Sequence, residues 1–171
     1  MRPVLWIVLF VLVTAAGCNG AKPGGAAPCC DFVPNASLGS HLGQLVVAFP
    51  QGADVGISIV NVYKADGQTK LQGGIGNQSW QLTPGTYSIE ISGVRLPNVE
   101  VKAGSDTRVR VGVLLVKVGG NTIADVLDAS GRKLDGHMGG FAMGLPAGSY
   151  GVRIDGQTHP VQIQAGTTTN Y

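Results

Sequence analysis

The sequence predicts an all-β protein, and four observations support this prediction. Glycine is abundant, with 27 of 171 residues, and it interrupts almost every apolar segment. Val, Ile and Thr dominate the segments between the glycines, and β-branched residues favour extended strands. Beyond residue 17, apolar residues keep helical spacing for no more than about two turns. Finally, the chain repeats itself from about residue 45 onward, which is typical of tandem structural units.

Residues 1–17 are predicted to be a secretory signal peptide. Arg2 gives a positively charged start, residues 4–13 form an unbroken apolar run, and residues 14–17 are small. A run of this length is too short to span a bilayer permanently. We therefore expect this segment to direct export and to be removed.

The end of the signal peptide, Ala15-Ala16-Gly17-Cys18, resembles the lipobox of bacterial lipoproteins. That family usually has Leu where this chain has Ala15. The resemblance implies cleavage before Cys18, diacylglycerol on the Cys18 sulfur, and a palmitate-bearing anchor in a membrane of the cell envelope. Asn19 favours outer-membrane display in a Gram-negative cell, because aspartate at this position is associated with inner-membrane retention.

Residues 18–44 are predicted to be a flexible tether, since a segment this rich in Gly, Ala and Pro cannot bury a core. Cys29 and Cys30 are adjacent, and a disulfide between neighbouring residues is strained because their Cα atoms lie too close together. Two interpretations stay open. The pair consists of thiols that become oxidised outside the cytosol, or Cys29 or Cys30 bridges two copies or a partner.

Residues 45–112 and 113–171 are predicted to be two related β units. The segment Leu-Thr-Pro-Gly-Thr-Tyr-Ser-Ile-Glu-Ile-Ser-Gly at 82–93 matches Leu-Pro-Ala-Gly-Ser-Tyr-Gly-Val-Arg-Ile-Asp-Gly at 145–156. Apolar and polar residues alternate in both, which predicts strands with one buried face, and the Pro-Gly and Ala-Gly pairs supply turns. The second copy ends in a short strand, which leaves two arrangements open: two separate cores, or two halves of one structure.

These alternating segments, followed by Val-Glu-Val-Lys-Ala-Gly at 99–104, resemble the prealbumin-like or carboxypeptidase-regulatory-like β-sandwich repeats of bacterial surface proteins. The resemblance covers residues 50–171. It implies two tandem Ig-like sandwiches of about seven strands each, used as spacer, accessory or binding modules. It carries no catalytic residues over to this chain.

Charge and motifs exclude several classes of function. Without Arg2, the 12 Lys and Arg fall to 11 against 10 Asp and Glu, which gives little attraction for nucleic acid. Catalytic elbows, phosphate loops and dinucleotide fingerprints are missing from the sequence. His41, His137 and His159 are scattered, and the aspartates at 125, 128 and 135 lack calcium-loop spacing. We therefore predict no enzyme activity, cofactor, metal site or nucleic-acid partner.

The leading hypothesis is a lipid-anchored structural or protein-interaction module of the cell envelope. Its partner would be an envelope protein or a polysaccharide. The alternative is a module that binds carbohydrate or another envelope polymer, which requires Trp80, Tyr63 or Phe141 to be exposed. Strand alternation instead predicts that Trp80 faces the core. A small enzyme is a third hypothesis, since carboxylate pairs can assemble across a fold.

Overall fold

The computed structural model describes residues 28–171, which form fifteen β-strands and no helix. The all-β prediction is confirmed for this part of the chain. The predicted signal peptide and the first part of the predicted tether lie outside the described residues. Across 28–171, no helical segment has the length and apolar character needed to cross a membrane.

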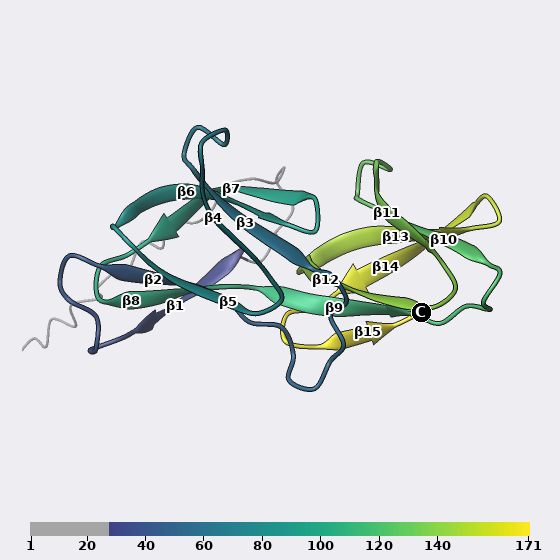
Figure 1. The fold of residues 1–171 in the computed structure, drawn as a ribbon, viewed down its shortest axis with the longest axis horizontal. Helices are drawn as coiled ribbons and strands as arrows, with labels where there is room; N and C mark the ends of the chain where they lie inside the picture. The colour runs from purple at the N-terminus through teal and green to yellow at the C-terminus, as the bar shows by residue number, and fades with distance from the viewer. Residues whose placement is uncertain (1–27) are drawn as a thin grey trace, which may run out of the picture.

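Strands β1–β8, which we call the first unit, form two four-stranded sheets. Their orders are β1-β8-β2-β5 and β4-β3-β6-β7, and Figure 1 shows the second sheet lying over the first. The strands are β1 (Cys30–Pro34), β2 (Gly43–Val47), β3 (Ile59–Lys64), β4 (Lys70–Ile75), β5 (Gln78–Leu82), β6 (Gly85–Ile91), β7 (Val94–Val101) and β8 (Ser105–Val109).

Strands β9–β15, the second unit, form a three-stranded and a four-stranded sheet. Their orders are β12-β9-β15 and β11-β10-β13-β14, and they are again stacked in Figure 1. The strands are β9 (Val111–Val116), β10 (Ile123–Leu127), β11 (Lys133–Met138), β12 (Phe141–Pro146), β13 (Gly148–Ile154), β14 (Gln157–Ile163) and β15 (Thr168–Asn170).

The two units pair their strands in the same way. In the first, β2 is antiparallel to β5 and parallel to β8; in the second, β9 is antiparallel to β12 and parallel to β15. Each unit has its own cluster of buried hydrophobic side chains between its sheets. Of the two arrangements left open by the sequence, the structure shows two cores.

Strand β9 connects the two cores. Only Arg110 separates β8 from β9, so these strands run on almost without interruption. Val111 and Val113 belong to the first cluster, whereas Leu114 and Val116 belong to the second. Successive side chains of a strand point to opposite faces, so β9 turns one face towards each cluster.

The loop between β2 and β3 also joins the units. Phe49 is buried against β12 at Gly144, where a Cβ atom would overlap the phenyl ring. The Gly144 N–H donates a 2.7 Å hydrogen bond to the Ser58 hydroxyl, which is buried as well. A residue without a side chain therefore lets the first unit pack onto the outer face of a sheet of the second.

Two predicted boundaries differ from the structure. The predicted flexible tether includes residues 30–34, but these residues form β1, antiparallel to β8. Four of its five residues are exposed, so the strand is held by pairing with the edge of β8 and has no periodic apolar signal of its own. The predicted boundary between 112 and 113 falls inside β9, and the change of sheet occurs at Arg110.

Candidate interaction surface

The three cysteines noted in the sequence lie in different parts of the chain. Cys18, the predicted lipidation site, lies outside the described residues. Cys29 and Cys30 stand at the start of β1 with their Sγ atoms 3.2 Å apart. Cys30 is buried in the first core and Cys29 packs against the same cluster. The pair therefore belongs to the folded unit, at the junction between β1 and β8.

The histidines are far apart in the fold, as they are in the sequence. His41 lies in the turn before β2, His137 in β11 and His159 in β14. His137 Nε2 lies 3.1 Å from a carboxylate oxygen of Asp135, and its ring contacts Phe141. Within residues 28–171, the structure brings together no group of three or more His, Cys, Asp or Glu side chains that is suited to a metal ion.

The aspartates noted in the sequence hold sheets and turns together. Asp125 lies between Lys133 and Arg153, at 2.7 Å from each, and hydrogen bonds from these cations lower its pKa. Asp128 caps the turn between β10 and β11, where hydrogen bonds from Ser130 and Arg132 lower its pKa to about 2. Both carboxylates are ionised at neutral pH and fully engaged, so they are poorly suited to proton transfer.

The three aromatic residues named for the carbohydrate alternative do not form an open platform. Trp80 packs partly buried against the first core, and Phe141 does so against the second. The Tyr63 ring is covered by the Arg95 guanidinium, which lies 4.5 Å from its centroid. The prediction that Trp80 faces the core agrees with this arrangement.

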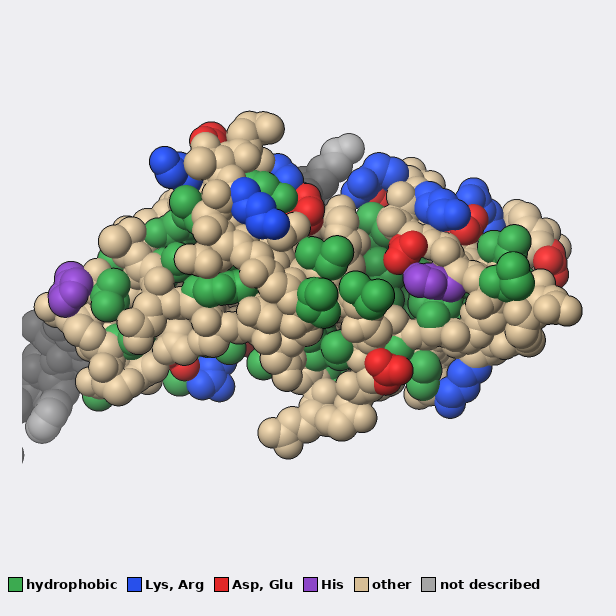
Figure 2. Space-filling view, viewed as in Figure 1, with side chains coloured by type: hydrophobic (Ala, Val, Ile, Leu, Met, Phe, Trp, Pro, Cys, Tyr) green, Lys and Arg blue, Asp and Glu red, His purple; other side chains and the backbone are tan. Residues whose placement is uncertain are grey.

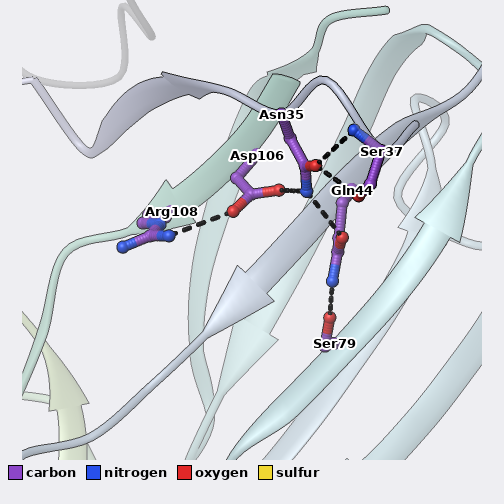
Figure 3. Close-up of polar contacts among 6 residues, drawn as sticks. All are labelled: Asn35, Ser37, Gln44, Ser79, Asp106 and Arg108. Carbon is purple, nitrogen blue, oxygen red and sulfur yellow. Dashed lines mark hydrogen bonds and ion pairs between the residues drawn. The ribbon is translucent and has the colours of Figure 1, made fainter. Parts of the chain in front are cut away.

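A ladder of polar side chains crosses the sheet β1-β8-β2-β5 (Figure 3). Asn35 donates to Asp106 at 2.7 Å and to Gln44 at 3.4 Å, and Gln44 donates to the Ser79 hydroxyl. The other Asp106 oxygen accepts from Arg108 at 3.1 Å. The hydrogen bond from Asn35 is the main reason that the pKa of Asp106 is lowered. The ladder fixes the segment after β1 across three neighbouring strands.

The most distinctive surface feature is a pair of exposed apolar side chains that occurs in both units. Ile59 and Ile75 are cross-strand neighbours on β3 and β4; Ile123 and Met138 are the corresponding neighbours on β10 and β11. We call them the apolar pairs. Their exposed fractions are 48% and 61%, and 60% and 68%. Figure 2 shows exposed hydrophobic side chains where the units meet and towards the far end of the second unit.

Strand geometry explains why these side chains face outward. Val60 and Ala124 are fully buried, so the residues just before them, Ile59 and Ile123, point to the opposite face. The sequence contains this signal, because two apolar residues in a row interrupt the alternation at both places. Sequence reasoning missed it because the buried residue and the exposed residue have the same chemical character.

An open hollow of about 550 Å³ lies beside the loop between β2 and β3. Asp54 and Lys117 are the charged residues of its lining, and the remaining residues are apolar or Gly. The lining holds no cluster of titratable groups. The residues that line the hollow are Asp54, Leu115, Val116, Lys117, Val118, Gly140, Phe141 and Ala142.

Comparison with known proteins places this chain in no family. No family model matches the chain, and no curated protein matches it. Among solved structures, the Bacillus anthracis TIE protein is 16% identical, with a TM-score of 0.32 over 77% of this chain and 33% of that chain. The BSP domain of a biofilm associated protein is 13% identical, with a TM-score of 0.20 over 72% and 30%. The matched region spans about a third of those chains, and similarity at this level carries no inference about function.

Proposed function

We propose that this protein is a non-catalytic interaction module of the cell envelope, held at a membrane by lipid on Cys18. In this proposal the two units are tandem Ig-like sandwich repeats, and residues 18–28 connect them to the anchor. The observation that carries the proposal is the occurrence of the apolar pairs at the same register position in both units. Such side chains are costly to expose unless a partner covers them.

The apolar pairs favour a protein partner over a polysaccharide. Ile and Met side chains offer neither the aromatic faces nor the hydrogen-bonding groups that bind sugars, whereas they fit apolar depressions on proteins. Two similar surfaces on one chain also allow two contacts with a repetitive or oligomeric partner. A second contact made by the same molecule raises the overall affinity without any new kind of interaction.

The contact surface is tested by photo-crosslinking in the producing cells. A photoreactive amino acid at position 59 or 123 should give discrete cross-linked products in the envelope. The same amino acid at exposed Gln157 is the matched control and should give none.

A second change in each pair shows whether the pair acts as one surface. Ile75 lies opposite position 59 and Met138 lies opposite position 123. Ile75→Ser should therefore reduce the product formed from position 59, and Met138→Ser should reduce the product formed from position 123. Equal products from positions 59, 123 and 157 would contradict the proposal.

The anchor is tested separately with a palmitate analogue. Cys18→Ala should abolish labelling and release the protein from membranes, whereas Cys29→Ala should keep both properties. Persistent labelling of the Cys18→Ala variant would exclude this cysteine as the lipidation site. Because the apolar pairs lie far from residue 18 in sequence, failure of the anchor leaves the interaction surface to be judged by the crosslinking alone.

A further inference from the structure

Strand β15 of the second unit corresponds to β8 of the first. The Thr107 hydroxyl in β8 donates to the Glu100 carbonyl at 3.0 Å, and the Thr169 hydroxyl in β15 donates to the Gln162 carbonyl at 3.2 Å. In addition, β8 runs parallel to β2, and β15 runs parallel to β9. The two strands therefore occupy the same position in their sheets.

The turns that lead into these strands match as well. Gly104 and Gly166 both have positive φ, at 64° and 73°. Their N–H groups donate to the Leu42 and Val111 carbonyls, each at 2.8 Å. The correspondence thus extends to individual backbone hydrogen bonds.

The two strands differ in what lies on their other side. In the first unit, β1 pairs antiparallel with β8 and completes the sheet. In the second, no strand from residues 28–171 pairs with the other side of β15. Within residues 28–171, a single residue, Arg110, connects β8 to β9, so no described segment precedes β9 in the way that β1 precedes β2.

The open edge of β15 presents unpaired backbone groups. Thr167 and Tyr171 bond to β9: the Val113 N–H donates to the Thr167 carbonyl, and the Lys117 N–H donates to the Tyr171 carbonyl. Backbone groups alternate in direction along a strand, so the N–H and C=O of Thr168 and Asn170 point away from β9. Both residues are exposed. The segment that is hydrogen-bonded to β9, residues 167–171, has the same length as β1.

Most other sheet edges of the described residues carry features that discourage pairing. Four edge strands contain proline, and β4 and β11 each have lysine together with a register shift. Only β5 and β15 among the eight edges have neither. The strand of the second unit that corresponds to β5 is β12, which is also an edge strand. The second unit therefore has no additional strand that would be missing beside β5. The prolines are Pro34, Pro97, Pro146 and Pro160.

We infer that β15 binds an extended segment of a partner protein as an antiparallel strand, in the position that β1 takes beside β8. Thr168 and Asn170, whose backbone groups point outward, have uncharged side chains, so the segment is expected to be uncharged where it meets them. A second copy of this chain is a poor occupant. Its β1 would have to leave its own β8, and the number of strand pairs would not increase.

The experiment uses a labelled peptide of residues 28–36, with Cys29→Ser, Cys30→Ser and Asp31→Asn, and the purified full-length protein. Apart from these changes, the peptide has the sequence that pairs with β8 in the first unit, and Asp31→Asn makes it uncharged opposite Asn170. Fluorescence anisotropy should show saturable binding with a dissociation constant below about 1 mM. Absence of binding at a protein concentration of about 1 mM would overturn the proposal.

Methylated peptides test the geometry without changing the protein. Beside β8, the Cys29 carbonyl accepts from the Arg110 N–H, and the Asn35 N–H donates to the Gly104 carbonyl. The backbone N–H and C=O groups of the odd-numbered residues of this segment therefore point towards β8. An N-methyl group on Val33 should therefore weaken binding at least about tenfold, whereas one on Phe32 should leave it unchanged. Equal effects of the two methyl groups would overturn strand addition.

Protein variants locate the site. Asn170→Pro removes an outward N–H without removing a bond to β9, and should weaken peptide binding at least about tenfold. Asn170→Ala keeps that N–H and should bind as the original chain does. If Asn170→Pro binds normally, the peptide displaces β1 from β8 and the proposal is wrong. It is also wrong if the protein alone forms dimers that Asn170→Pro dissociates, because the occupant is then a second copy.

Discussion

The two units share their strand pairing but differ in the polar groups on their outer faces. At one matched cross-strand position, the first unit has Asn61 opposite Glu90, joined by a 3.3 Å hydrogen bond. The second has Asp125 opposite Arg153, joined at 2.7 Å. The acidic partner has changed strand while the contact has been kept. Backbone pairing and inward apolar residues therefore define the unit, and outward residues have only to satisfy one another.

The inward-facing tyrosines show the opposite behaviour, because both are kept in the same role. The Tyr87 hydroxyl donates to the Thr83 carbonyl at 2.6 Å, and the Tyr150 hydroxyl donates to the Pro146 carbonyl at 2.9 Å. Each bond closes the turn that precedes its strand. Thr83 is exposed whereas Pro146 is buried, so the same bond is shielded from water only in the second unit.

The largest predicted effect tests whether the two units are stable independently. Phe49 belongs to the first unit but is buried against Gly144 of the second, so Phe49→Ala should lower the free energy of unfolding by about 3–5 kcal/mol. Urea unfolding measures this loss, and hydrogen exchange of β12 shows whether it reaches the second unit. Phe32→Ala, at an exposed position, is the control and should cost far less. Protection of β12 equal to that of the original chain would show that the units do not depend on this contact.

The same contact shows what the sequence could predict. The strands around Tyr87 and Tyr150 follow from local alternation, since every residue that specifies them lies within a few positions. The burial of Phe49 depends on Gly144, nearly a hundred residues away, and no local pattern connects the two. Sequence reasoning therefore predicted the β class but not the contact between Phe49 and Gly144.

The missed strand β1 has a similar cause. Cys30 pairs with Val109 and Pro34 with Ser105, so its conformation depends on a distant partner strand. Its own residues include proline and its neighbours are rich in Gly and Ala, which locally favour a loop. The apolar pairs were missed for another reason. Period-two alternation identifies which residues differ from their neighbours, and Ile59 does not differ from Val60.

An intermediate effect is predicted for the two tyrosines. Tyr150→Phe leaves the buried Pro146 carbonyl without this donor and should cost about 1–3 kcal/mol of unfolding free energy. Tyr87→Phe should cost only about 0.5–1.5 kcal/mol, because water can reach the exposed Thr83. Thermal or urea unfolding of the two variants measures the difference. Equal losses would mean that the two turns are shielded from water to the same degree.

The smallest predicted effect is a difference in acid sensitivity between the matched turns. Hydrogen bonds from Ser130 and Arg132 lower the pKa of Asp128 from 3.8 to about 2. Asp66 in the first unit also has a lowered pKa, mainly because of the Thr69 and Gln68 backbone N–H groups, but no arginine within residues 28–171 forms an ion pair with it, as Arg132 does with Asp128. A carboxylate whose pKa is lower in the folded state stabilises the fold above the unfolded value. That contribution is lost as the pH falls from about 4 towards 2.

Asp128→Asn should therefore reduce the loss of stability between about pH 4 and pH 2, because the variant has no proton to take up at this position. Asp66→Asn is the matched change in the first unit and should reduce the loss less. Urea unfolding at several pH values measures both slopes. If Asp128→Asn leaves the slope unchanged, the turn of the second unit does not hold its carboxylate more firmly in the folded state than in the unfolded chain. The two turns would then be equivalent despite their different partners, and Arg132 would contribute only an exposed ion pair of little weight.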